Sequence, residues 1–197
     1  NISDCSTDVL ITFLSYVYSV GGFIGQGQGE ISIQNSSSIG DINLPTYSYS
    51  GGGFVGWLRG DSSISDSFST GNIILTSDTQ GSGGSYDMGG FAGKLGDSSD
   101  SESAYIYRCH STGYILSRAV EGEIEYPGVG DNDFGGFVGS IFYEAIIEDS
   151  YSTGSITTGT DSTNWGGFVG YISLSSSSDS SIRRSYATGD ITMDYEA

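Results

Sequence analysis

Few residues of this chain could carry nucleophilic or acid–base chemistry. It has one histidine, His110, and two cysteines, Cys5 and Cys109. A catalytic Ser–His–Asp triad needs a histidine as its base, so any such site would depend on His110. Cys109 is its direct neighbour, and successive residues of a strand point to opposite faces, which argues against a Cys–His pair. We therefore predict that the chain is not an enzyme.

Carboxylates are plentiful, with 24 Asp and Glu against six Lys and Arg and a net charge of −18. Asp97, Asp100 and Glu102 in one segment, or Asp131 and Asp133 in another, could supply the two carboxylates of a glycosidase. Solvated acidic loops are the simpler interpretation. Calcium is the other use of such loops, since carboxylate oxygens suit that ion, although neither segment matches an EF-hand. We expect no cofactor and leave calcium open.

The acidic balance also limits the partners. Nucleic-acid binding needs clustered Lys and Arg, so nucleic acid is excluded. An anionic membrane surface would repel the chain for the same reason. The apolar stretch from Val9 to Val20 contains only 12 residues and includes Thr12 and Ser15. It is too short and too polar to span a bilayer, so no membrane span is predicted.

The cysteines and two asparagines are candidates for covalent modification. Cys5 and Cys109 could form one disulfide that ties the N-terminal segment across the rest of the chain, or Cys109 could be a buried free thiol. Asn1 and Asn35 begin the sequons Asn1-Ile2-Ser3 and Asn35-Ser36-Ser37. Both are candidate N-glycosylation sites if the source is a eukaryote.

Two linked blocks recur along the chain. The first, Gly-Gly-Phe-x-Gly, occurs at 21–25, 52–56, 89–93, 135–139 and 166–170. The second has ten residues, begins and ends with Ile, and occurs at 33–42, 64–73, 106–115, 147–156 and 182–191. The gap from Phe to the first Ile is 10 residues in copies one, two and four, against 15 and 14 in copies three and five. Such regular pairing indicates a repeat protein.

Short runs of Phe, Val, Ile and Tyr separated by glycines predict strands joined by turns. One repeat cannot bury its apolar side alone, and stacking similar repeats solves that problem. We therefore predict an all-β solenoid of five coils about 4.8 Å apart. Its core ladder would consist of the phenylalanines of the first block: Phe23, Phe54, Phe91, Phe137 and Phe168.

The second block should alternate between core and surface. A small residue would point inward and the next residue outward. The outward column would then be Phe68, His110, Tyr151 and Tyr186, which could pack as a ladder or offer a glycan platform. The glycines of the block are expected to make turns with positive φ: Gly40, Gly71, Gly113, Gly154 and Gly189.

The ends of the array suggest self-association. Residues 1–20 precede the first repeat, and their apolar residues would occupy both faces of a strand, so this segment is expected to cap the first coil or to be donated to another molecule. Residues 21–197 would form the five-repeat solenoid. Open solenoid ends expose strand edges that can pair with another chain, so we predict assembly into a filament.

The pair GGFVG and I-x-x-S-Y-S-T-G-x-I resembles the GLUG repeat, most closely at 135–139 with 147–156 and at 166–170 with 182–191. The resemblance covers about residues 21–192. It implies a secreted, adhesin-like surface protein that is extracellular or on the cell surface. Two alternatives stay open: an adhesive module that binds glycans or other surface proteins, and a non-catalytic repeat region of a larger secreted enzyme.

Overall fold

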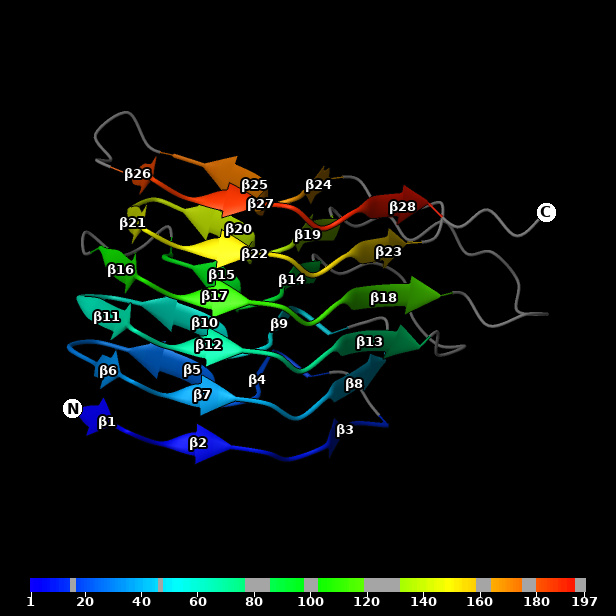
Figure 1. The fold of residues 1–197 in the computed structure, drawn as a ribbon, viewed down its shortest axis with the longest axis horizontal. Helices are drawn as coiled ribbons and strands as arrows, with labels where there is room; N and C mark the ends of the chain where they lie inside the picture. The colour runs from blue at the N-terminus through cyan, green and yellow to red at the C-terminus, as the bar shows by residue number, and fades with distance from the viewer. Residues whose placement is uncertain are drawn as a thin grey trace.

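The computed structural model describes residues 1–14, 17–45, 48–76, 86–97, 103–118, 132–158, 164–174 and 180–193. Within these residues every regular element is a short β-strand, and each strand pairs in parallel with its equivalent in the next coil (Figure 1). The predicted all-β solenoid is therefore confirmed. Each coil passes through five sheets, named here A to E, in the order D, E, A, B, C.

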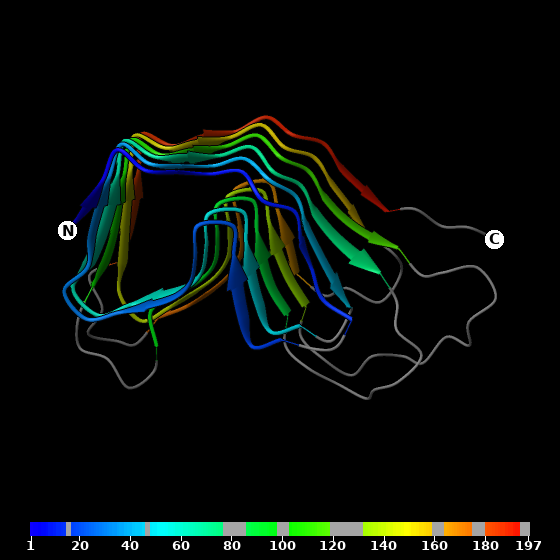
Figure 2. The ribbon, with the colours of Figure 1, turned by 90° about the horizontal axis from the view of Figure 1, so that it is seen from below.

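Sheets D and E form an arch inside the molecule (Figure 2). Sheet D contains β4 (Ser19–Gly21), β9 (Ser50–Gly52), β14 (Tyr86–Gly89), β19 (Asn132–Gly135) and β24 (Asn164–Gly166). Sheet E contains β5 (Ile24–Gln28), β10 (Val55–Arg59), β15 (Ala92–Leu95), β20 (Val138–Phe142) and β25 (Val169–Ser173). The Gly-Phe pair in the middle of each first block makes the bend between the two strands.

Sheets A, B and C form the outer wall around the arch. Sheet A contains β1 (Ile2–Ser3), β6 (Ser32–Gln34), β11 (Ser62–Ser65), β16 (Ala104–Tyr107), β21 (Ala145–Glu148) and β26 (Ser181–Arg183). Sheet B contains β2 (Ser6–Thr7), β7 (Ser37–Ser38), β12 (Phe68–Ser69), β17 (His110–Ser111), β22 (Tyr151–Ser152) and β27 (Tyr186–Ala187). Sheet C contains β3 (Ile11–Thr12), β8 (Ile42–Pro45), β13 (Ile73–Thr76), β18 (Ile115–Arg118), β23 (Ile156–Thr158) and β28 (Ile191–Met193).

Residues 1–12 form an additional half coil below the first repeat. Its strands β1, β2 and β3 pair in register with β6, β7 and β8, with Ile2 on Ile33 and Ile11 on Ile42. The segment therefore covers the first coil through three short strands, of which only Ile11–Thr12 falls in the apolar stretch. Within the single chain Leu10 and Leu14 of that stretch are exposed, and the donation of this segment to another molecule stays a prediction.

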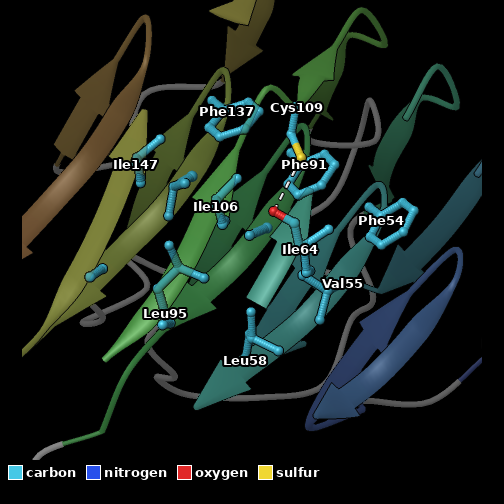
Figure 3. Close-up of a cluster of buried hydrophobic side chains, with 14 of the residues drawn as sticks. Phe54, Val55, Leu58, Ile64, Phe91, Leu95, Ile106, Cys109, Phe137 and Ile147 are labelled. Atoms are coloured by element: carbon cyan, nitrogen blue, oxygen red, sulfur yellow. Dashed lines mark hydrogen bonds between the residues drawn. The ribbon is translucent and has the colours of Figure 1, made fainter. Parts of the chain in front are cut away.

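The interior holds two apolar clusters, one on each side of the arch. The larger lies between sheets A and E and contains the Phe column, in which Phe54, Phe91 and Phe137 are fully buried (Figure 3). Adjacent Phe rings from Phe23 to Phe168 have centroids 4.7 to 5.0 Å apart and are tilted by 10° or less. The smaller cluster lies between sheets C and D and includes Leu44 and Met88.

The glycines let the arch approach sheet B closely. A Cβ atom on Gly90 would lie 2.9 Å from Ser111 Oγ, and one on Gly136 would lie 2.9 Å from Ser152 Oγ. Instead, these inward hydroxyls donate hydrogen bonds to arch carbonyls: Ser111 Oγ lies 2.8 Å and Ser152 Oγ 2.7 Å from the oxygen of Gly136. Polar contacts therefore join the arch to the wall between the two apolar clusters.

The glycines of the second block have a different role from the predicted one. Gly40, Gly71, Gly113, Gly154 and Gly189 do not have positive φ, so the turn prediction is wrong. A Cβ atom on Gly71 would overlap the carbonyl oxygen of Gly40, and one on Gly113 would overlap that of Gly71. Glycine is required at this corner because the backbones of successive coils touch.

Changing Phe137 to Ala should lower the free energy of unfolding by about 3–5 kcal/mol, because a fully buried ring with ring neighbours above and below leaves a cavity. Urea unfolding measures the loss. Phe23→Ala is the matched comparison, since Phe23 is only partly buried and stacks on one ring, and its loss should be smaller. A Phe137→Ala loss below about 1 kcal/mol would contradict the Phe column.

Changing Gly136 to Ala should cost about 1–3 kcal/mol, because the new methyl group would overlap the carbonyl oxygen of Gly167 as well as Ser152 Oγ. Gly167→Ala provides the control, since its Cβ would lie 3.5 Å from Ala187 Cβ, an ordinary contact. Its stability should change by no more than about 0.5 kcal/mol. Equal losses at the two positions, measured by thermal and urea unfolding, would refute the close-approach explanation.

Candidate functional site

The structure places Cys109 and His110 on opposite faces of the wall. Cys109 is fully buried in the larger apolar cluster, whereas His110 lies in the outward column of sheet B. Burial raises the pKa of the Cys109 thiol to about 12, so the sulfur stays protonated at neutral pH. A protonated thiol is a poor nucleophile. The two side chains do not form a catalytic pair.

The candidate disulfide is absent: Cys5 is an exposed free thiol and Cys109 a buried one. Both occupy the small inward position of the second block, but Cys5 belongs to the half coil and Cys109 to the third coil. Three layers at about 4.8 Å separate them, well beyond the reach of a disulfide. Cys109 Sγ instead lies 3.6 Å from the carbonyl oxygen of Ile64 and donates to it (Figure 3).

The candidate glycan platform on sheet B is a continuous stack of rings. Phe68 and His110 have centroids 5.1 Å apart, His110 and Tyr151 4.7 Å, and Tyr151 and Tyr186 5.2 Å, with tilts of 3 to 8°. Each inner ring therefore has both faces covered by its neighbours and turns only an edge outward. A sugar stacks on the face of a ring, so this column does not offer the surface that a glycan platform needs.

Burial also lowers the pKa of His110, so the folded protein holds a neutral imidazole in the stack. The unfolded chain takes up a proton below the ordinary value of 6.5, whereas the folded chain does so only at lower pH. The neutral ring therefore stabilises the fold above pH 6.5, and this contribution is lost as the pH falls toward the lowered pKa.

We expect His110→Phe to reduce the loss of stability between pH 7.5 and pH 5, because the phenyl ring fills the same layer without titrating. Urea unfolding of both proteins across this range measures the difference. Tyr151→Phe is the matched control, since it alters the adjacent ring of the ladder and leaves the imidazole in place. Parallel pH profiles for wild type and His110→Phe would contradict the buried neutral histidine.

Of the candidate carboxylates, the structure describes only Asp97 and Asp133. Asp97 forms an ion pair with Arg59, with Oδ2 2.8 Å from Nη1. Asp133 is not in a solvated loop, as had been expected, but lies in β19 with 3% of its surface exposed. Asp100, Glu102 and Asp131 lie outside the described residues. Among the residues that are described, no three His, Cys, Asp or Glu side chains form a group that could hold a metal.

A column of carboxylate, amide and guanidinium side chains marks the corner between sheets A and B. The repeats alone align the five members from Asn35 to Arg184, but they do not show the half-coil member Asp4 or the ion pairs between layers. The members of this column all have φ between 50 and 56° and occupy equivalent positions in the half coil and the five coils: Asp4, Asn35, Asp66, Arg108, Asp149 and Arg184. Asn and Asp tolerate this left-handed conformation best, which explains four of the six.

The two arginines of the corner column each reach down to an aspartate. Arg108 Nη2 lies 2.6 Å from Asp66 Oδ2, and Arg184 Nη2 lies 3.0 Å from Asp149 Oδ2 and 2.9 Å from Glu148 Oε2. The hydrogen bonds from these arginines lower the pKa of Asp66 and of Asp149. Arg adopts the left-handed conformation less readily than Asn or Asp, and at both Arg positions of this corner the guanidinium group forms an ion pair.

The candidate glycosylation asparagines both lie on the surface at the N-terminal end. Asn1 is exposed, and Asn35 is exposed in the corner column, where its Nδ2 lies 3.4 Å from Asp4 Oδ1. A sugar on Asn35 would extend away from the core without displacing a buried group.

The described residues contain no helix long and apolar enough to cross a membrane. No curated protein and no solved structure matches the chain. The family model described as the GLUG motif matches residues 16–43, 47–74 and 130–157. Each match joins an arch to the wall segment that follows it, and the other two copies stack in the same register. Three of the five repeats of this chain are therefore GLUG motifs.

Proposed function

We propose that this protein is a non-enzymatic, extracellular structural protein, a subunit of a surface fibre or adhesin stalk that assembles end to end or by strand donation. The regular cross-section supports this proposal, because every coil offers the next one the same five strand edges. The buried thiol and the stacked histidine support a structural role over a catalytic one.

The corner column is the observation that carries the proposal. Its charges run upward as Asp66, Arg108, Asp149, Arg184, so that each arginine lies above an aspartate. The first half coil carries Asp4 in this column and the last coil carries Arg184, which is exposed. A second copy stacked in register on the last coil would place its Asp4 above Arg184, as Asp149 lies above Arg108.

The isoleucines of sheets A and C at the two ends of the stack are also complementary. Ile182 and Ile191 are 40% and 43% exposed in the last coil, and in-register stacking would cover them with Ile2 and Ile11 of the next copy. These contacts involve sheets A, B and C, which have six strands each because the half coil adds β1, β2 and β3, whereas sheets D and E have five. Main-chain pairing along three strand edges needs no special side-chain code.

Net charge opposes association at long range. At −18, two copies repel each other in dilute buffer, whereas 0.15 M salt reduces the screening length to about 8 Å. Charges on adjacent layers of the corner column are closer together than that length, so salt does not screen their attraction fully. We therefore expect assembly to increase from low salt to physiological salt.

Asp4→Arg should weaken assembly on the order of tenfold at 0.15 M salt, because it replaces an attractive pair with two facing guanidinium groups. Sedimentation velocity over a concentration series measures the association constant, and electron microscopy shows whether the assemblies are linear. Asp61→Arg is the matched control, since Asp61 is exposed beside β11, away from the stacking ends, and the change in charge is the same.

Equal weakening by the two variants would reject the corner contact in favour of a general charge effect. A wild-type chain that stays monomeric at high concentration and physiological salt would overturn the fibre proposal itself.

A further inference from the structure

Sheet D contains two buried carboxyl groups next to each other. Asp87 in β14 and Asp133 in β19 are direct partners in the parallel pairing of these strands. They are 5% and 3% exposed. Adjacent strands lie about 4.8 Å apart, so the two side chains share one desolvated environment. Two ionised carboxylates in such a position repel each other, and one of them normally keeps its proton.

The surroundings of the two acids differ. Asn164 Nδ2 donates a hydrogen bond to Asp133 Oδ1 at 2.8 Å, which suits an ionised carboxylate. Asp87 Oδ2 accepts a long hydrogen bond from Ser50 Oγ, at 3.4 Å. Its other oxygen, Oδ1, is buried and has no hydrogen bond of good geometry, and the same holds for the Ser140 hydroxyl of sheet E. An ionised Asp87 would leave this negative oxygen without a partner.

The nearby charged and titratable groups do not supply a tight counter-ion. Lys94 in β15 is the cation that partly opposes the rise that burial causes in the pKa of Asp87. Its Nζ lies over the rings of Trp57 and Phe142, 4.8 and 4.5 Å from their centroids. Tyr171 in β25 follows Ser140 in the same column and is 39% exposed. Burial raises the pKa of Asp87, and contacts with Ser140, Lys94, Ser50 and Asp133 only partly oppose this rise.

We propose that Asp87 and Asp133 share one proton in the folded protein, so that a hydrogen bond joins the two carboxyl groups. The pair thus carries one negative charge and forms a proton-dependent contact between the third and fourth arches. A proton needs no additional space, whereas a metal ion would need oxygen ligands beyond these two carboxylates. This contact goes beyond the proposed structural function and does not depend on assembly.

The proton makes folding sensitive to pH in a defined direction. The unfolded chain releases the Asp87 proton near the ordinary value of 3.8, whereas the folded chain keeps it to higher pH. Between these two points the folded state holds one proton more than the unfolded state. Stability from this group is therefore greatest in acid and falls as the pH rises toward the raised pKa, above which it stays constant.

The test compares wild type with Asp87→Asn, whose amide retains a donor and cannot ionise. Urea unfolding of the full chain is measured in steps from pH 4 to pH 9. Across the window in which the folded acid keeps its proton, the unfolding constant of wild type should rise about tenfold per pH unit relative to the variant. His110 and the other acids are present in both proteins, so their contributions to the pH dependence of stability cancel in the comparison. Asp61→Asn, at an exposed aspartate, should give a difference that is flat with pH.

Infrared spectroscopy in D₂O provides a measurement on wild type alone, in case Asp87→Asn fails to fold. A protonated carboxyl band should persist in the folded protein above the pH at which an ordinary aspartic acid ionises, and should disappear on unfolding. Its absence, or a pH-independent difference between wild type and Asp87→Asn, would overturn the proposal. Stabilisation by calcium at constant ionic strength in wild type but not in Asp87→Asn would also overturn it, because a cation would then occupy the site.

Discussion

The fold depends on the close contact between the glycine arch and the inward hydroxyls of sheet B. Without a side chain at Gly90 or Gly136, the arch reaches the wall and its carbonyl oxygens accept hydrogen bonds from serines such as Ser111. This contact divides the interior into two clusters narrow enough for single columns of Phe, Ile and Leu to fill. A methyl group at Gly90 or Gly136 would overlap the next arch and the serine of the wall, and would disturb both clusters.

Repetition converts this local contact into a column of equivalent interactions. Because all sheets are parallel and in register, each residue type stacks on its own kind, which favours aromatic rings and aliphatic side chains but penalises like charges. The molecule manages its charged columns in two ways. At the outer corner, aspartates alternate with arginines, as in Asp66 and Arg108. In the interior, where Asp87 lies under Asp133, a shared proton would serve the same purpose.

The sequence predicted the parts of the fold that depend on spacing. The interval between Phe and Ile was enough to place the ring ladder and the outward aromatic column, because strand alternation and stacking leave little freedom. The half coil escaped notice since Ser6 and Val9 replace the aromatic residue and the glycine of the second block. Asp133 was assigned to a solvated loop, although it shares with Asp87 a position two residues before the Gly-Gly pair, which is a buried strand position.

The central claim is that all five repeats, including those that the family model does not match, form equivalent layers of one stack. Hydrogen exchange of the third coil tests it most directly, because its amides donate across layers: Phe91 N to Phe137 O at 2.9 Å, and Ile115 N to Ser155 O at 2.9 Å. These amides should be protected as strongly as those of the second and fourth coils, with protection falling toward the half coil and the last coil. Third-coil amides that exchange at the rate of an unstructured chain would contradict the account.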